Sequence, residues 1–236
     1  MIERYTRPEM GHLWSIQNEW QTILNVEIAA CEAMAELGEI PTAAVENIKK
    51  NARFDVARIN EIEKTTDHDI IAFLTNLEEN VGEDSKYIHK GLTSSDVKDT
   101  AYCVMMRDAA AIILDDLRAF REVLRRRAEE FRHTPCIGRT HGIHAEPMTF
   151  GLKLLLWSAE IERDIERLTR AKEIVSVGKL SGAVGTYSNI DPRIEELTCK
   201  KLGITPVRLA TQVIQRDRHA EFVTTLAIIA GTMEKI

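Results

Sequence analysis

The sequence has 236 residues and a net charge of −6, from 31 Lys and Arg against 37 Asp and Glu. Hydrophobic residues make up 44% of it and charged residues 29%, which excludes a disordered chain and leaves ample apolar material for a buried core. The acidic balance argues against a protein that coats DNA or RNA, because binding to phosphates requires clustered positive charge.

The cysteines and the N-terminal residues indicate a compartment. Cys31, Cys103, Cys136 and Cys199 contain no CxxC pair, and four cysteines in a chain of this length do not make a disulfide framework. The first residues lack the basic end and apolar run of a signal peptide, and no apolar run is long enough to cross a bilayer. We therefore expect a soluble protein in a reducing compartment, the cytoplasm.

The first third of the chain has the periodicity of helices. Apolar residues recur every three or four positions from Leu13 to Ile23, which predicts one helix over about 8–37 that ends at Gly38. Shorter helices are predicted over 42–51, 55–64 and 68–80.

Longer helices are predicted in the rest of the chain, because apolar faces continue over many turns. The predicted elements are a helix over 94–132, a helix from about Pro147 to Val175, a Gly- and Ser-rich loop over 178–191, a helix that Asp191-Pro192 opens and Gly203 closes, and a last helix from about Thr211. The last helix is still in phase at Ile236 and lacks a stop signal, so we expect the chain to be truncated.

These elements predict an all-α fold. Long helices joined by short loops are typical of a helical bundle, so we expect a small N-terminal helical domain over 1–93 and an incomplete long-helix bundle over 94–236. The long helices carry more apolar surface than their neighbours in one chain can cover. We therefore expect their apolar faces to meet copies of themselves in a homo-oligomer.

Polar segments between the helices hold the residues that could do chemistry, and the first is Thr65-Thr66-Asp67-His68-Asp69. The two carboxylates beside His68 would favour its protonated form and could orient its ring. The alternative is a helix cap made by Thr66 or Asp67 with a surface histidine, and the sequence alone favours that alternative.

A second segment, His89-Lys90-Gly91-Leu92-Thr93-Ser94-Ser95-Asp96, precedes the longest predicted helix. Hydroxyl groups and free backbone N–H groups at a helix start can bind a carboxylate or a phosphate. A simple helix cap is the alternative, since every helix needs one, but three consecutive hydroxyl residues exceed that need. Both interpretations stay open.

A third segment runs from Gly138 to Pro147 and contains Gly138-Arg139-Thr140-His141-Gly142-Ile143-His144. Its glycines allow close approach of the backbone to a ligand, and His141 could act as a general acid or base near neutral pH. A metal site formed by His141 and His144 with Glu146 or Cys136 is disfavoured, because the spacing matches no established zinc pattern. For His144 we favour an ordinary loop histidine.

A fourth segment, from Gly178 to Thr186, is rich in Gly and other small residues. It is neither a P-loop nor a GxGxxG motif. The choice is between a bare linker and a loop that contacts a ligand, and we favour the second slightly. Near the last helix, Gln212, Arg216 and His219 are predicted to share one helical face, where they could clamp an anion if buried.

Together these segments resemble the fumarase/aspartase superfamily of lyases, and within it the adenylosuccinate lyase family. The resemblance runs from Arg4 to Ile236 and rests on five blocks in the same order, which are Thr66-x-His68-Asp69, Gly91-Leu92-Thr93-Ser94-Ser95-Asp96, Gly138-Arg139-Thr140-His141-Gly142-x-His144-Ala145-Glu146-Pro147, Lys179-x-Ser181-Gly182-Ala183-Val184-Gly185-Thr186 and Gln215-Arg216-Asp217-Arg218-His219. Several blocks in one order are a specific signal, whereas any one of them alone would be weak.

The resemblance implies an activity and an assembly. The family releases fumarate by β-elimination from adenylosuccinate, which gives AMP, and from the succinyl-carboxamide ribotide of purine biosynthesis. It uses no metal and no organic cofactor. The family's fold has three helical domains, and the central one pairs with its copies in a homotetramer in which each active site draws on three subunits.

The resemblance also assigns roles to single residues. His141 corresponds to the general acid, and His68 to a histidine that assists near the succinyl group and the leaving nitrogen. The positions implied to bind substrate are Arg4, Tyr5 and His89 at the nucleotide and phosphate end, Thr93 and Ser94 at the succinyl carboxylates, and Asp69 and Gln212.

One departure from the family is large. The family's general base is a serine in a Gly-Ser-Ser-x-Met-Pro-x-Lys-x-Asn stretch, and neither this stretch nor the glutamate that partners the general acid occurs in the 236 residues. The resemblance therefore predicts that the chain holds part of the active site, is a fragment of a protein roughly twice as long, and is inactive alone.

Two other functions remain as alternatives. Another fumarate-releasing lyase of the same superfamily would turn over malate, aspartate or argininosuccinate instead. A non-catalytic helical scaffold would gain no stability from AMP plus fumarate, because only a ligand that binds the folded form raises stability. The clustering of histidines and hydroxyl groups between the helices speaks against the scaffold.

Overall fold

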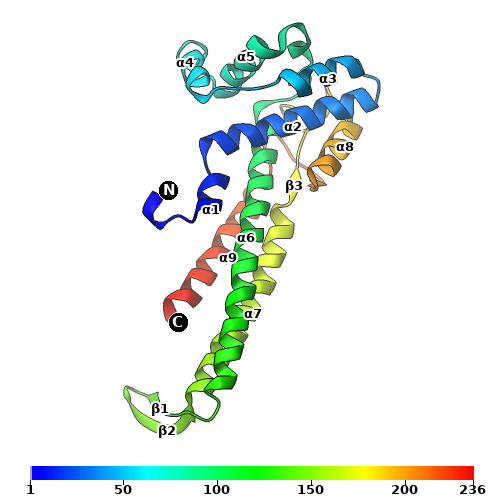
Figure 1. Ribbon diagram of the computed structural model, residues 1–236. Helices are drawn as coiled ribbons and strands as arrows, with labels where there is room; N and C mark the ends of the chain where they lie inside the picture. The colour runs from blue at the N-terminus through cyan, green and yellow to red at the C-terminus, as the bar shows by residue number, and fades with distance from the viewer. Residues whose placement is uncertain (1) are drawn as a thin grey trace. The chain divides into compact units, whose positions relative to one another are not determined.

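The computed structural model describes residues 2–236, most of which lie in helices (Figure 1). The chain forms two compact units. The first comprises the chain up to Asp108 together with Val175–Gln215, and the second comprises Ala109–Ile174 and Arg216–Ile236. The predicted boundary after residue 93 falls inside the first unit, so the compact units differ from the predicted domains, and the domain division remains a prediction.

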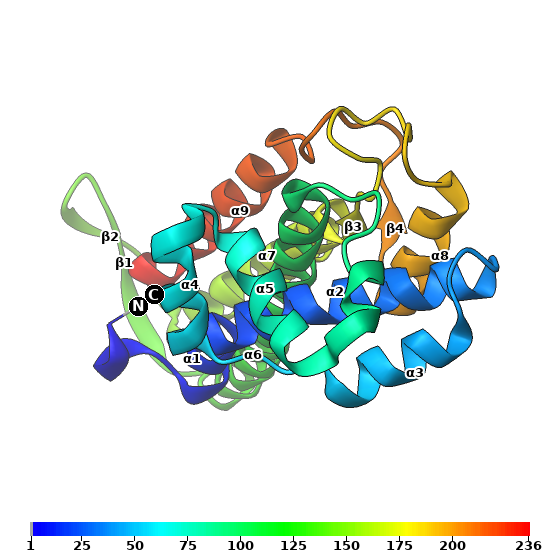
Figure 2. The ribbon, with the colours of Figure 1, turned by 90° about the horizontal axis from the view of Figure 1, so that it is seen from above.

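The first unit contains a short 3-10 helix, a set of α-helices and a small parallel ladder. Its elements are η1 (Glu3–Tyr5), α1 (Pro8–Leu13), α2 (Ile16–Glu36), α3 (Thr42–Asn51), α4 (Val56–Thr66), α5 (Asp69–Val81), η2 (Gly82–Tyr87), the first part of α6 (Ser94–Glu130), β3 (Val177–Gly178), α8 (Pro192–Leu202) and β4 (Thr205–Pro206). Helix α2 packs against α3 and α8, and α4 packs against α5 (Figure 2).

The prediction of one helix over 8–37 is wrong, because the chain breaks between α1 and α2. Ser15 has an extended backbone, and its hydroxyl accepts the N–H of Asn18 at 3.2 Å, which starts a new helix. The apolar spacing continues through the break, so periodicity alone could not reveal it. The shorter predicted helices agree with α3, α4, α5 and α8 to within two residues.

The core of the first unit is built around aromatic rings. Trp20 of α2 stacks on Phe73 of α5 with ring centroids 4.9 Å apart, and Phe54 meets the same ring edge-on. Gly178 lets the β3 ladder lie close to α8, since a Cβ at this position would come within 2.7 Å of the Cys199 sulfur. The two strands pair in parallel, with Val177 opposite Thr205.

The second unit contains the remainder of α6, a β-hairpin and two further helices (Figure 1). Its elements are β1 (Pro135–Thr140), β2 (Ile143–Thr149), α7 (Phe150–Val175) and α9 (Asp217–Lys235). Gly151 brings the start of α7 against the end of α6, because a Cβ here would lie 2.4 Å from the carbonyl oxygen of Ala128. Glu160 of α7 binds Lys235 and Thr232 of α9.

Three predictions for the second part of the chain need correction. Residues 138–147, predicted as a loop, form most of an antiparallel hairpin, and the helix predicted from Pro147 therefore begins at Phe150. The last helix begins at Asp217 and not near Thr211, because the Ile214 amide is held by the buried Asp99 carboxylate at 2.8 Å. Gln212 therefore lies outside the helix and shares no helical face with His219.

The all-α class is confirmed for the described residues, with short strands as additions. Of the helices in residues 2–236, none combines the length and the hydrophobicity required to cross a bilayer.

Candidate active site

His68 forms the N-cap of α5. Its Nδ1 accepts the N–H of Ile71 at 3.3 Å, so the proton of the neutral ring lies on Nε2, which is 3.4 Å from the Ser94 hydroxyl. The predicted capping by Thr66 or Asp67 is wrong for α5, since Asp67 ends α4 in a left-handed conformation (φ 49°). The structure shows an arrangement that neither interpretation described: the histidine itself is the cap, and its other nitrogen faces a hydroxyl at the start of α6.

Asp69 accepts two hydrogen bonds in the described part of the chain. One of its oxygens accepts the Ile70 N–H at 2.8 Å, and the other pairs with the Lys98 ammonium from α6. Burial alone would raise the pKa of Asp69, but Lys98 and the Ile70 N–H outweigh burial and lower this pKa. Asp69 therefore joins the first turn of α5 to α6, and its predicted role in substrate binding stays a prediction.

The start of α6 is capped without using its hydroxyl groups. The Thr93 N–H donates to Asp96 Oδ2 at 2.9 Å, and the Asp96 N–H donates to the Thr93 carbonyl at 2.8 Å. Within the described residues, the Thr93 hydroxyl has no hydrogen bond, and the only partner of the Ser94 hydroxyl is the His68 ring. The helix cap thus leaves the hydroxyl groups of Thr93 and Ser94 accessible to a ligand, so a cap and a ligand site are compatible in this segment.

Asp96 also connects the second and fourth segments of the sequence. The Lys179 ammonium lies 2.5 Å from Asp96 Oδ1, and both side chains are fully buried. The N–H groups of Ser181 and Gly182 donate to the same carboxylate. The loop after β3 is thus fixed beside the start of α6, and the Ser181 hydroxyl, buried there, has no partner among the described residues.

His89 is tied to α2 through Glu27. The ring Nδ1 lies 2.6 Å from one oxygen of Glu27, and the His89 backbone N–H donates to the other at 3.0 Å. Burial would lower the pKa of His89, but the buried Glu27 carboxylate outweighs burial and raises it. His89 therefore presents a positively charged ring over a wider pH range than an ordinary histidine.

This pair predicts a pH dependence of stability. A raised pKa in the folded state stabilises the fold fully below the unfolded value of about 6.5, and this stabilisation is lost as the pH rises through the folded pKa. We compare the free energy of unfolding in urea of the wild-type protein with that of His89→Gln. The wild-type protein should be more stable by the largest margin at about pH 6, and this margin should shrink as the pH rises toward 9. A difference between the two proteins that does not change with pH would contradict the assignment.

Three further predicted substrate residues lie at the surface of the first unit. The Arg4 guanidinium stacks over the Tyr5 ring at 4.7 Å, and Tyr5 is 73% exposed. Gln212 is exposed in the segment that Asp99 anchors through Ile214. In the described part of the chain, none of the three forms a hydrogen bond with His68 or Ser94. The structure therefore leaves their predicted roles untested.

His141 occupies the tip of the hairpin in the second unit. It and Gly142 form the two-residue turn between Thr140 and Ile143, and both have positive φ, 53° and 75°. Positive φ at both positions is what a type I′ turn requires, and it is uncommon for a histidine. The ring is exposed, and the place of His141 in one site with His68 is therefore a proposal, since the two belong to different units.

Sequence reasoning missed Lys98 and Glu27, and it named Lys179 and Ser181 only as members of the fourth segment, without a role for either. The contacts of these residues join positions far apart in the chain, so no local motif reveals them. Within residues 2–236, no three His, Cys, Asp or Glu side chains are arranged to hold a metal ion.

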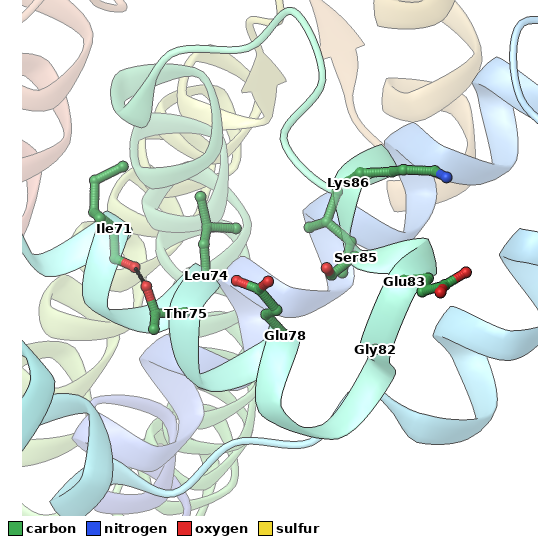
Figure 3. A pocket seen from close by; sticks show the side chains of 9 residues that line it. Ile71, Leu74, Thr75, Glu78, Gly82, Glu83, Ser85 and Lys86 are labelled. Carbon is green, nitrogen blue, oxygen red and sulfur yellow. Dashed lines mark hydrogen bonds between the residues drawn. The ribbon is translucent and has the colours of Figure 1, made fainter.

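A cavity of about 600 Å³ lies between α5 and η2 (Figure 3). It is lined by Ile71, Leu74, Thr75, Glu78, Gly82, Glu83, Ser85, Lys86 and Ile88. None of the predicted site residues lines this cavity, although Ile71 is the residue whose amide His68 caps. The candidate site is instead the exposed edge formed by the starts of α5 and α6.

A family model described as a lyase matches residues 3–236. The chain belongs to this lyase family. Adenylosuccinate lyase of Bacillus subtilis (strain 168) is 52% identical over 235 residues, and that of Synechocystis sp. is 54% identical. Each alignment covers all of this chain and 54% of the relative, so the chain spans about half the length of these curated lyases.

Solved structures of other enzymes share the fold. A fumarate lyase from Mesorhizobium sp. BNC1 superposes with a TM-score of 0.90 at 30% identity, covering 96% of this chain and 55% of that one. The β-carboxy-cis,cis-muconate cycloisomerase of Acinetobacter calcoaceticus sp. ADP1 gives 0.90 at 28% identity, covering 97% and 56%. The fumarase/aspartase-like fold expected from the resemblance is confirmed.

Proposed function

We propose that the protein carrying this chain is an adenylosuccinate lyase, which eliminates fumarate from adenylosuccinate to give AMP. We extend the proposal to the succinyl-carboxamide ribotide. The high identity to adenylosuccinate lyases over the whole chain supports the substrate class. The single structural observation that supports the site is the contact between His68 Nε2 and the Ser94 hydroxyl, which lie at the starts of two helices.

The proposed elimination has three parts. A general base takes a proton from the carbon beside a carboxylate, the electron pair forms the carbon–carbon double bond, and the carbon–nitrogen bond breaks. The departing nitrogen takes a proton from a general acid. In this proposal His141 is the acid and the base comes from outside the 236 residues. No metal or organic cofactor takes part.

The first unit would bind the substrate's anionic groups. The hydroxyl groups of Thr93 and Ser94 and the amides at the start of α6 would receive a succinyl carboxylate, since helix N-termini favour anions. The His68 Nε2–H would stand beside that carboxylate or the leaving nitrogen. The charged ring of His89 and the guanidinium of Arg4 would serve the phosphate end, with Tyr5 and Gln212 as further contacts.

The assembly would be a homotetramer with shared active sites. Leu152, Leu155 and Leu156 of α7 and Val223 of α9 are each more than half exposed, and Ile228 of α9 is 50% exposed. Such apolar surface is typical of a helical interface. Because His141 sits at an exposed hairpin tip, it could enter a site on another copy. No disulfide joins the cysteines of the described residues, which agrees with a cytoplasmic location.

The test is an assay of fumarate release by the complete natural gene product. Adenylosuccinate, argininosuccinate, malate and aspartate are offered in parallel, and we expect release from adenylosuccinate alone. Release from another of the four would keep the elimination chemistry and overturn the purine substrate. No release from any, together with no thermal stabilisation by AMP plus fumarate, would overturn the proposed function in favour of a helical scaffold.

A further inference from the structure

The starts of α5 and α6 are joined by two side-chain links, only one of which involves a residue with a proposed catalytic role. The first link is His68 to Ser94, at 3.4 Å. The second is Asp69 to Lys98, an ion pair between side chains that are 35% and 33% exposed. The two residues on α5 are consecutive, and the two on α6 are one helical turn apart, so both links leave α6 from the same face.

The first link alone cannot hold the His68 ring. A contact of 3.4 Å between a ring nitrogen and a hydroxyl is longer than an ordinary hydrogen bond, and the His68 side chain is 45% exposed. The ring is also the cap of its own helix, at 3.3 Å from the Ile71 amide. Its orientation therefore depends on how the first turn of α5 is placed.

The second link acts on that same turn. Asp69 accepts the Ile70 N–H at 2.8 Å, directly beside the Ile71 N–H that His68 accepts. Lys98 holds the other oxygen of Asp69 and so connects the first turn of α5 to α6. A charge-assisted hydrogen bond is about twice as strong as a neutral one, so this link is the stronger of the two.

We propose that Lys98 is a positioning residue, which through Asp69 fixes the first turn of α5 so that the His68 ring faces Ser94. The inference rests on the proposed function, because it assigns Lys98 to the placement of a histidine that acts in the elimination. Lys98 itself does not touch the reacting atoms. Its effect is on rate, since a small misplacement of a catalytic group can cost up to about 10²-fold.

The test compares Lys98→Met with Lys98→Arg in the complete natural protein. We expect Lys98→Met to lower kcat for fumarate release roughly tenfold, with KM changed by less than about threefold, because placement and not binding is lost. Lys98→Arg should keep most of kcat, since a guanidinium can still reach Asp69. Hydrogen exchange of the Ile70 and Ile71 amides should quicken in Lys98→Met and remain near wild type in Lys98→Arg.

Lys49→Met provides the matched control. It removes a different lysine–carboxylate ion pair of the first unit, between Lys49 of α3 and Glu32 of α2 at 2.8 Å. This variant should leave kcat and the exchange of Ile70 and Ile71 unchanged. The proposal is overturned if Lys98→Met keeps full kcat, or if kcat falls while the two amides exchange as in wild type.

Failure of the inference can be told apart from failure of the proposed function. If the wild-type protein releases fumarate from none of the offered substrates, the proposed function fails. The exchange of Ile70 and Ile71 still decides whether Lys98 orders the start of α5. Unchanged exchange in Lys98→Met would then overturn the positioning role as well.

Discussion

Replacing His141 in the complete natural protein is expected to abolish fumarate release. Loss of a general acid typically costs about 10²–10⁴-fold in rate, and we expect a fall of kcat in this range. The fold should be little affected, because the ring is exposed at the tip of the β1–β2 hairpin. Steady-state kinetics measure the first expectation, and thermal unfolding with light scattering measures the second.

The backbone at His141 decides which replacement is informative. With φ at 53°, an alanine would add strain of about 1 kcal/mol to the turn, whereas asparagine tolerates the left-handed conformation. His141→Asn therefore removes the imidazole and keeps the turn, and it is the better variant. His144→Ala, on the next strand of the same hairpin, should keep most of the activity.

The outcomes for His141 discriminate between roles. Near-wild-type kcat in His141→Asn would remove His141 from the mechanism. Loss of activity accompanied by loss of the oligomer would point to a role of the hairpin in assembly. Loss of activity in a protein of unchanged size and melting temperature would leave the general acid as the explanation.

The helices that sequence reasoning located best are those whose ends are set by capping residues close to them in the sequence. Asp191 accepts the Arg193 N–H at 2.8 Å to start α8, and Gly203 ends that helix with φ at 67°. Such signals involve residues only a few positions apart. The break at Ser15 uses the same capping chemistry, but it lies inside a continuing apolar pattern and was hidden by it.

The hairpin could not be foreseen for a different reason. Its central dipeptide, His141-Gly142, is an unusual version of the turn, because asparagine or aspartate normally precedes the glycine. Its strands are mostly exposed, so they lack the alternation of apolar and polar residues that predicts a strand. The histidine was found from its chemistry, but its position on a strained turn was not.

The candidate site was located in part. The segments around His68 and Ser94 were singled out separately, and the structure brings them together. Lys98 was missed and Lys179 received no role, because each pairs with a carboxylate that lies 29 or 83 positions away. Sequence patterns could not reveal these ion pairs because the two members of each pair are far apart in the sequence, and not because the interactions are weak.

Replacing Lys179 is expected to cause the largest loss of stability. Lys179 and Asp96 form an ion pair with both side chains fully buried, so Lys179→Met would leave a buried carboxylate without its counter-charge. Removing one partner of such a pair typically costs about 3–5 kcal/mol, and we expect the free energy of unfolding in urea to fall by this amount. Lys235→Met, which breaks a more exposed pair with Glu160, should cost far less stability.

The double variant Lys179→Met with Asp96→Asn separates two contributions to the loss of stability: the missing ion pair and the cost of burying an unpaired carboxylate. It should recover part of the loss, because the neutral amide that replaces the carboxylate no longer needs a buried cation. A loss below about 1 kcal/mol in Lys179→Met would contradict the burial of the pair. Asp96 also receives the amides of Ser181 and Gly182, so breaking the pair should loosen the loop beside Thr93. In the proposed enzyme, Lys179→Met should therefore bind the succinyl carboxylate more weakly, although Lys179 itself is buried and does not contact it.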